Sequence, residues 1–383
     1  MSFHPFLSTV QTMTILIISE ADDLHAAAVG WGLRALGCEP VLWRWSAFPR
    51  ADSASFYLDS GGDARLELTL DGAVHSRPFD AVWNRRPGKP APRAASHPAD
   101  LKVIRDESLA YLRNVAPFIA HPGTLWVNGI DEARHANHKT LQLLAARAVG
   151  LPIPDTLIGN EIDKVRQFYR KHGGKIIYKA FQPGGWDHGD GSTTMLRTAA
   201  LAAQDLAHEE AVRACPGIFQ QQVDTDYELR VTVMGERLVA GAIHSQAAGP
   251  SVDWRYSGVL GQVPLTPVEL APELAARCLA LCRRLGLAFG CIDLIVRPDG
   301  EAVFLEINEA GQFLWKEGIA PDLPMLDTFC RLLAGGGVGR QVPPLRLADY
   351  YQSASFAEFK LLERRGTAPE ESLFTPDPPR PGA

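Results

Sequence analysis

The feature that most constrains this chain lies at residues 291–308, where two apolar runs flank a turn signal and carry acidic side chains. The Pro-Asp-Gly sequence at 298–300 indicates a β-hairpin, and the flanking runs are too apolar for an exposed one. Because side chains alternate with period two along a strand, we expect Asp293, Glu306 and Asn308 on one face. The hairpin would therefore bring two carboxylates and an amide together within a largely buried sheet.

The expected register of this hairpin follows from a four-residue loop at 297–300. Val296 would then pair with Glu301, and Asp293 would pair with Phe304. Burying two carboxylates without cations is costly. Two carboxylates and an amide oxygen are hard ligands that suit Mg²⁺ shared with substrate phosphates, so we predict a metal site. The alternative is an edge hairpin with solvated acids, which the apolar flanks disfavour.

Length and charge limit the classes of function. A chain of 383 residues with 46% apolar residues suits two or three packed domains. A formal net charge of -6 argues against a nucleic-acid binder, because neutralising phosphates needs a basic face. No apolar run is long enough for a membrane span, and residues 1–12 lack the pattern of a signal peptide. We expect a cytoplasmic protein without a membrane or nucleic-acid partner.

The N-terminal part has the pattern of an α/β domain. Residues 14–19 are expected to form a buried strand, 26–36 a helix and 39–44 a second strand. The Gly-x-Gly-x-x-Gly fingerprint is missing from the first turn, so nothing indicates a dinucleotide there.

Phosphates that share Mg²⁺ need cationic partners, and three basic residues upstream of the hairpin are candidates. Lys139 opens a helix, where main-chain amides suit anions, and Lys179 ends an apolar strand. Arg230 lies on a strand whose alternation puts Glu228 on the same face, and a two-residue turn would place Gly241 opposite Arg230 with room for a ligand. The alternatives are surface lysines and a cross-strand salt bridge.

A polar, glycine-dense loop at 183–194 contains Gly184 and Gly185. Such a loop can present main-chain amides to phosphates and close as a lid. An ordinary mobile turn is the alternative.

Taken in order, these pieces resemble the ATP-grasp superfamily: two lysines, a glycine-rich flap, a hinge strand, an arginine, and Leu-Glu-Ile-Asn at 305–308. The resemblance implies ATP and Mg²⁺ as cofactors, with two ions held by Asp293, Glu306 and Asn308. It also implies that Arg230 holds the γ-phosphate and acts in catalysis. The implied nucleotide-binding residues, of which the three at 221–223 line the adenine hinge, are Lys139, Lys179, Gly184, Gly185, Gln221, Gln222, Val223, Glu228 and Arg230.

Within the superfamily the chain looks most like the maturases of graspetides, the microviridin-type peptide cyclases. The similarity lies at residues 83–87, 226–233, 243–246, 253–255 and 306–312. That family joins side-chain carboxylates of a ribosomal precursor peptide to Ser/Thr hydroxyls or Lys amines, giving ester or amide rings. The resemblance implies a precursor peptide, with leader and core, as the partner, and we expect a homodimer.

The implied fold is a multidomain α/β (α+β) one, in which a Rossmann-like pre-ATP-grasp domain precedes the ATP-grasp fold. The expected divisions are an N-terminal extension at 1–13, the pre-ATP-grasp domain at 14–127, a central small subdomain at 128–218, a C-terminal subdomain with the Mg-ATP site at 219–335, and a partly disordered extension at 336–383.

Candidates for handling the peptide lie outside the phosphate site. His244 and Arg255 are candidates for catalysis at the acceptor or the carboxylate. In a regular hairpin His244 would point away from Arg230, so a structural histidine is an alternative. Arg85 and Arg86 could bind an anionic substrate, or they could be a solvated loop pair. The expected substrate-binding residues are Arg85, Arg86, Asp253, Trp254 and Arg255.

The function that we predict is an ADP-forming carboxylate ligase that activates Asp or Glu side chains of a precursor peptide as acyl phosphates. A hydroxyl or amine of the same peptide would then attack and close a ring. One rival is a small-molecule carboxylate–amine ligase, similar to the ligases that add glutamate to ribosomal protein. Another, of a different class, is a non-catalytic ATP-binding interaction protein.

Overall fold

The computed structural model of the chain describes residues 12–182, 184–190, 192–245, 264–335 and 341–366. The chain forms two compact units. The first comprises residues 1–127 with 326–383, and the second comprises residues 128–325. No helix among the described residues has the length and hydropathy that crossing a membrane requires.

The first unit is built on a parallel sheet with the order β2-β1-β6-β7. Its inner strand β1 is buried from Ile15 to Ile18, as expected for a parallel strand covered on both faces. Helix α1 joins β1 to β2, so the predicted strand–helix–strand start is confirmed. The bounds are β1 (Thr14–Ile18), α1 (Leu24–Ala35), β2 (Glu39–Trp43), β6 (Phe79–Asn84) and β7 (Ala120–Val127).

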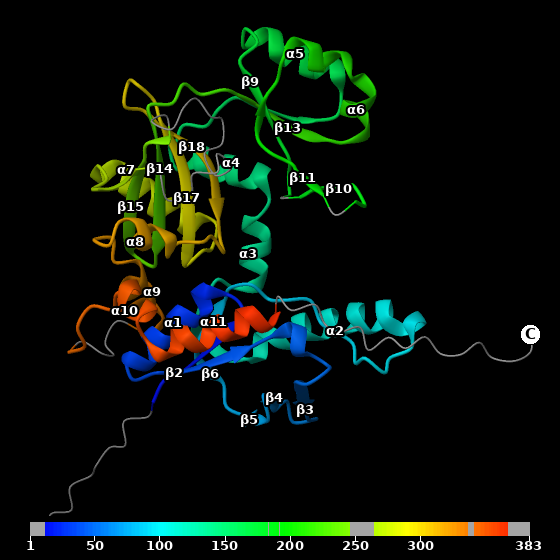
Figure 1. Ribbon diagram of the computed structural model, residues 1–383, viewed down its shortest axis with the longest axis vertical. Helices are drawn as coiled ribbons and strands as arrows, with labels where there is room; N and C mark the ends of the chain where they lie inside the picture. Colours follow the sequence, from blue (N-terminus) through cyan, green and yellow to red (C-terminus); the bar gives the residue numbers. More distant parts are fainter. Residues whose placement is uncertain (1–11, 183, 191, 246–263, 336–340, 367–383) are drawn as a thin grey trace, which may run out of the picture. The chain divides into compact units, whose positions relative to one another are not determined.

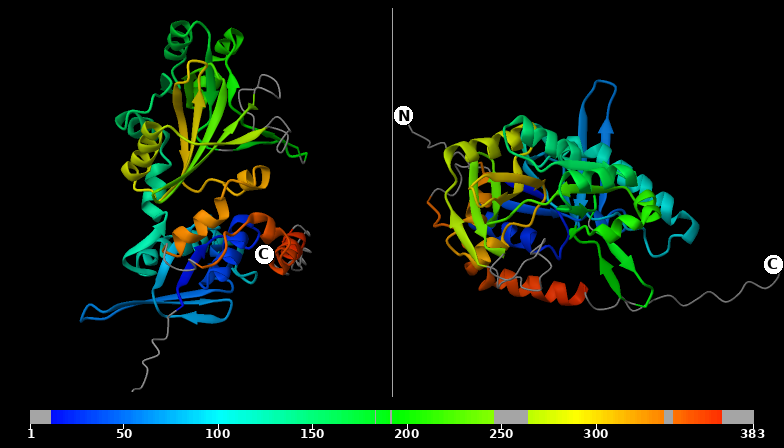
Figure 2. Two further views of the ribbon diagram at one scale, coloured as in Figure 1. Left: turned by 90° about the vertical axis from the view of Figure 1, so that its left-hand side faces the viewer. Right: turned by 90° about the horizontal axis from the view of Figure 1, so that it is seen from above.

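Two further parts complete this unit. An antiparallel sheet of order β3-β4-β5 lies between β2 and β6 in the sequence, and its β3–β4 hairpin projects from the parallel sheet (Figure 2). Helices α10 and α11 contact α1, so residues 341–366 pack on the N-terminal unit. The bounds are β3 (Ser53–Leu58), β4 (Ala64–Leu70), β5 (Ala73–His75), α2 (Leu101–Val115), α9 (Met325–Leu333), α10 (Leu347–Tyr351) and α11 (Ala354–Gly366).

The second unit contains a small antiparallel sheet of order β12-β9-β13-β8 and a separate hairpin, β10–β11. Helices α5 and α6 contact each other beside this sheet (Figure 1). The bounds are β8 (Thr156–Gly159), α5 (Ile162–Lys171), β9 (Ile176–Lys179), β10 (Gly185–Asp187), β11 (Thr193–Met195), β12 (Ala199–Ala200), α6 (Glu209–Ala214) and β13 (Gly217–Gln221).

The sheet that carries the predicted metal ligands has the antiparallel order β16-β15-β14-β17-β18. One of its faces packs on α4 and α7 through a core that includes Leu229, Ile292 and Leu294. Helix α8 contacts the opposite face through Lys316. The bounds are α3 (Ile130–Ala136), α4 (Lys139–Ala148), β14 (Tyr227–Met234), β15 (Arg237–Ile243), β16 (Leu265–Val268), α7 (Pro272–Arg284), β17 (Phe289–Val296), β18 (Ala302–Asn308) and α8 (Trp315–Ile319).

Candidate active site

The register of the β17–β18 hairpin differs from the one that we predicted. Val296 pairs with Ala302 rather than Glu301, because Glu301 belongs to the turn, where its carboxylate accepts a hydrogen bond from Arg297. The predicted pairing of Asp293 with Phe304 is also wrong. The register shifts between Asp293 and Leu294, where Leu305 of β18 has no opposite residue. This β-bulge places Glu306 directly opposite Asp293.

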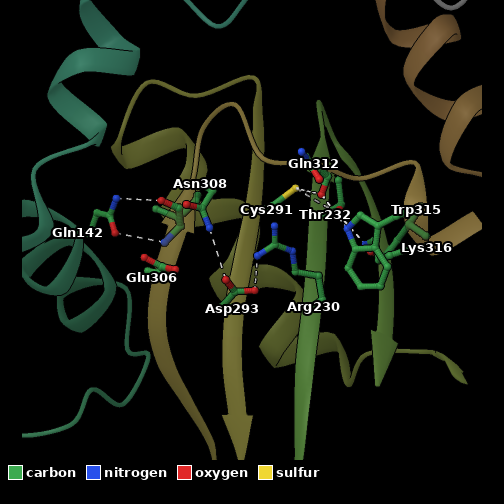
Figure 3. Close-up of polar contacts among 12 residues, drawn as sticks. Gln142, Arg230, Thr232, Cys291, Asp293, Glu306, Asn308, Gln312, Trp315 and Lys316 are labelled. Atoms are coloured by element: carbon green, nitrogen blue, oxygen red, sulfur yellow. Dashed lines mark hydrogen bonds and ion pairs between the residues drawn. The ribbon is translucent and has the colours of Figure 1, made fainter. Parts of the chain in front are cut away.

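The bulge separates the acidic residues from the core. Leu294 and Phe304 pair with each other and are buried on the core face. On the other face, Asn308 Nδ2 donates to Asp293 Oδ2 at 3.4 Å, and Glu306 lies beside them (Figure 3). The structure therefore brings the three predicted metal ligands together on one face.

Two predicted phosphate-binding cations pair with these carboxylates. Lys139 Nζ lies 2.6 Å from Glu306 Oε2, and Arg230 forms an ion pair with Asp293. Both pairs are largely shielded from solvent, with side-chain exposures between 12% and 24%. Burial opposes the charge on Arg230, but Asp293, Cys291 and Glu306 together outweigh burial and raise the pKa of the guanidinium. The two ion pairs neutralise the acidic face.

Gly241 lies opposite Arg230 as predicted, but it leaves no room for a ligand. A Cβ atom there would lie 2.8 Å from Leu265 Cδ1 and 3.7 Å from Leu323 Cδ1. The lack of a side chain at Gly241 therefore leaves space for Leu265 and Leu323.

A buried glutamine that the sequence analysis missed fixes the edge strand. Gln142 Nε2 donates to the carbonyl oxygen of Ile307 at 2.8 Å, and the amide of Ile307 donates back to Gln142 Oε1 at 3.2 Å. Gln142 lies one helical turn after Lys139 on α4, so the same helix positions the lysine beside Glu306. A polar residue in the apolar stripe of a helix was the only sequence signal.

A second missed group lies next to Arg230. Lys316 is fully buried, and its Nζ donates to Thr232 Oγ1 at 2.7 Å and to the carbonyl oxygen of Val239 at 3.4 Å (Figure 3). Thr232 Oγ1 in turn lies 3.6 Å from Cys291 Sγ. Burial lowers the pKa of Lys316 to about 7.

Glu309 follows the metal-ligand motif and is held by two asparagines. Its Oε1 accepts from Asn137 Nδ2 at 2.7 Å, and its carbonyl oxygen accepts from Asn128 Nδ2 at 2.8 Å. Burial raises the pKa of its carboxyl group, although Lys139 and Asn137 oppose this. These contacts tie the start of the second unit to the end of β18.

The remaining predicted nucleotide-binding residues lie on the small sheet, at its exit and on the β10–β11 hairpin, except for Glu228, which lies on β14 of the larger sheet. Lys179 pairs with Ile218, and the amide of Gln222 donates to the carbonyl oxygen of Lys175 at 3.0 Å. Gly185 pairs with Met195 across the β10–β11 hairpin. The nucleotide-contact roles of this group stay predictions: Lys179, Gly184, Gly185, Gln221, Gln222, Val223 and Glu228, of which Glu228 accepts from Ser245 Oγ at 3.1 Å.

The structure places the predicted substrate residues in different surroundings. The ring of His244 lies 5.7 Å from that of Tyr227, and its Nε2 lies 3.2 Å from Thr266 Oγ1, away from the face of Arg230. The side chain of Arg85 is 1% exposed and pairs with Asp23 at 3.0 Å, so Arg85 is not part of a solvated loop pair. Arg86 is exposed. Three predicted residues lie outside the described residues: Asp253, Trp254 and Arg255.

The donor set suits Mg²⁺ better than a softer metal. The part of the chain that the structure describes has no group of three or more His, Cys, Asp or Glu side chains placed to hold a metal ion. The site at the bulge instead combines two carboxylates with the amide of Asn308. All three offer oxygen atoms, the ligands that Mg²⁺ takes alongside phosphate.

Comparison with known proteins identifies similar solved structures. The macrocyclase MdnC from Microcystis aeruginosa MRC, solved with the precursor peptide MdnA, is 26% identical, with 84% of this chain and 100% of that chain covered and a TM-score of 0.73. The ATP-grasp ligase PsnB, complexed with a phosphomimetic variant of its minimal precursor, Mg and ADP, is 26% identical, with coverages of 85% and 98% and a TM-score of 0.66.

A third similar structure shows the same fold. The Chryseobacterium gregarium RiPP-associated ATP-grasp ligase, solved with ADP and a leader and core peptide, is 23% identical over 87% of this chain and 100% of that chain, with a TM-score of 0.78. No family model matches the sequence, and no curated protein matches it. The predicted ATP-grasp fold and the resemblance to graspetide maturases are thus confirmed. The Rossmann-like character of the N-terminal domain stays a prediction.

Proposed function

We propose that this ATP-grasp ligase activates Asp or Glu side chains of a ribosomal precursor peptide as acyl phosphates and closes ester or amide rings within that peptide. The observation that carries the proposal is the face on which Asp293 and Glu306 lie opposite each other, next to Asn308, with Arg230 and Lys139 attached. The similarity to MdnC and PsnB, both solved with precursor peptides, supports the choice of substrate.

The basic residues of this face would bind phosphate, and the oxygen-donating residues would bind metal. Arg230 and Lys139 would hold nucleotide phosphate oxygens, where fixed positive charge stabilises the charge that develops during phosphoryl transfer. Asp293, Glu306 and Asn308 would hold Mg²⁺, which neutralises phosphate charge when bound. A peptide carboxylate attacks the γ-phosphorus and releases ADP, and a hydroxyl or amine then displaces phosphate from the acyl group. Holding both peptide groups in place supplies much of the rate.

Several finer assignments belong to the same proposal. We expect two Mg²⁺ ions, a homodimer and a cytoplasmic location. Residues 253–255 and Arg86 are proposed to contact the peptide. His244 would need a local rearrangement to reach the acceptor, because it shares its face with Tyr227.

The test combines purified protein, ATP, Mg²⁺ and a precursor peptide encoded beside the gene. Each ring closed should lower the peptide mass by one water and release one ADP. An unmodified peptide, with ADP release stimulated instead by a free amino acid or dipeptide, would favour the small-molecule ligase. Tight ATP binding with slow, unstimulated hydrolysis would favour a non-catalytic binding protein.

A further inference from the structure

A buried lysine lies on the face of Arg230 and has no carboxylate partner among the residues that the structure describes. Lys316 is 0% exposed, and within the described part of the chain its ammonium contacts only Thr232 Oγ1 and the carbonyl oxygen of Val239. Burying an ammonium without a counter-charge is expensive, and an apolar side chain of the same size would be cheaper. The presence of this lysine therefore calls for a functional explanation.

Its position relates it to the phosphate-binding arginine. Thr232 pairs with Val239 on one side and with Cys291 on the other, so Lys316 lies over this row of the sheet. Arg230 lies two residues earlier on the same strand and on the same face. Two residues along a strand span about 7 Å. Lys316 therefore lies above the residue pairs of Thr232, and Arg230 belongs to the neighbouring pairs on the same face.

The charges that face Lys316 come from both strands beneath it. The pKa of Lys316 is lowered to about 7, mainly by burial; Arg230 also lowers it, whereas Cys291 and Asp293 raise it. A negative group added near Arg230 would favour the protonated form of Lys316, because an opposite charge stabilises an ammonium. A buried ammonium of this kind acts through its field, with little screening by water.

We propose that Lys316 is a positioning cation of the phosphate site, which favours the γ-phosphoryl group at Arg230 without touching it. The inference rests on the proposed function, because it takes Arg230 as the γ-phosphate ligand. Lys316 lies above the residue pairs next to Arg230 on one face of the sheet, and no carboxylate of the described residues contacts its Nζ. A purely structural lysine would influence ADP and ATP binding equally.

The experiment compares two nucleotides by calorimetry, in the presence of Mg²⁺ and without peptide. Lys316→Met should weaken binding of the non-hydrolysable ATP analogue AMPPNP by about tenfold, within the usual range of coupling between sites. ADP, which lacks the γ-phosphoryl group, should lose no more than about threefold. The melting temperature should rise, because a buried charge is removed. The wild-type preference for AMPPNP over ADP should also decline from about pH 6 to about pH 8.5, whereas that of the variant stays constant.

Two controls complete the design. Lys102→Met removes a lysine whose side chain is 88% exposed, and it should change neither affinity. If Lys316→Met does not fold, Lys316→Gln removes the charge and keeps a donor for Thr232, and the same selective loss is expected. Equal losses for both nucleotides, or no loss, would overturn the inference. A wild-type protein that binds neither nucleotide would instead contradict the proposed function.

Discussion

Replacing Asp293 with asparagine should make nucleotide bind more tightly when no metal is present. In the wild-type protein Arg230 is paired with Asp293, and Lys139 is paired with Glu306. In the proposed site, phosphate oxygens would therefore compete with carboxylates for both cations, and the carboxylates left behind would face the phosphates. Mg²⁺ would remove this conflict, because it would bind the carboxylates while the phosphates bind the cations. We expect the ion pairs to couple nucleotide binding to metal binding in this way.

The magnitude follows from the geometry of the Arg230–Asp293 pair. The two side chains are 12% and 23% exposed, so water screens the pair only in part. A hydrogen bond to a charged group contributes about 1.5–3 kcal/mol, and the neutral one that asparagine retains contributes about 1 kcal/mol. The difference, about 0.5–2 kcal/mol, corresponds to about 2–30-fold in affinity.

The assay is calorimetric titration with ADP, in EDTA and in Mg²⁺. Asp293→Asn should bind metal-free ADP about 2–30-fold more tightly than wild type, and Mg²⁺ should add little to its affinity. Asp299→Asn changes an acid at the tip of the same hairpin, whose side chain is 59% exposed, and should behave as wild type. Metal-free binding that is no tighter in Asp293→Asn, or a full Mg²⁺ effect in that variant, would refute the coupling.

Three other substitutions test separate parts of the site. Glu306→Gln should abolish ADP release in the peptide assay, and full turnover would contradict the metal assignment. Lys316→Met should stabilise the protein by about 1–4 kcal/mol at pH 6. The pKa of Lys316 is about 7 in the folded protein against an ordinary 10.5, so the wild-type penalty is complete below pH 7 and vanishes above pH 10.5. Urea unfolding of both proteins across that range checks the sign, and a gain that grows with pH would be inconsistent with it. Gly311→Ala would place a Cβ 2.8 Å from Cys291 Sγ and 3.2 Å from Arg230. We expect a loss of about 1–3 kcal/mol in stability together with weaker nucleotide binding, and unchanged urea midpoints would argue against this crowding.

The sequence was sufficient to predict which residues share the acidic face. Strand alternation and one turn signal placed Asp293, Glu306 and Asn308 together, and a two-residue turn placed Gly241 opposite Arg230. Arg230 and Gly241 lie on an unbroken ladder, where the alternation holds throughout. Glu306 and Asn308 share the face of Asp293 because a bulge interrupts the alternation after Phe304, so this grouping is right although the predicted register is wrong.

The sequence was insufficient where a contact depends on tertiary packing. Lys316 follows Trp315 in a short helix, and no local pattern indicates that its ammonium lies over Thr232. Gln142 bonds to a strand 165 residues away. The space at Gly241 was expected to hold a ligand, but the side chain of Leu265 fills it. Leu265 lies on β16, more than twenty residues later in the sequence. Each case requires the relative placement of two elements, which periodicity does not provide.

The bulge in the β17–β18 hairpin decides whether the three proposed metal ligands can share one face. Without an extra residue, the pairing of Leu294 with Phe304 would continue to Ile292 opposite Glu306 and would direct the carboxylate of Glu306 into the apolar core. In the predicted register, Phe304 would instead share the acidic face and place a phenyl ring beside Asp293. The bulge at Leu305 avoids both outcomes, because Phe304 stays fully buried in the core while Glu306 lies opposite Asp293 on the other face. One irregular residue therefore allows a single strand to complete the core and to supply the site.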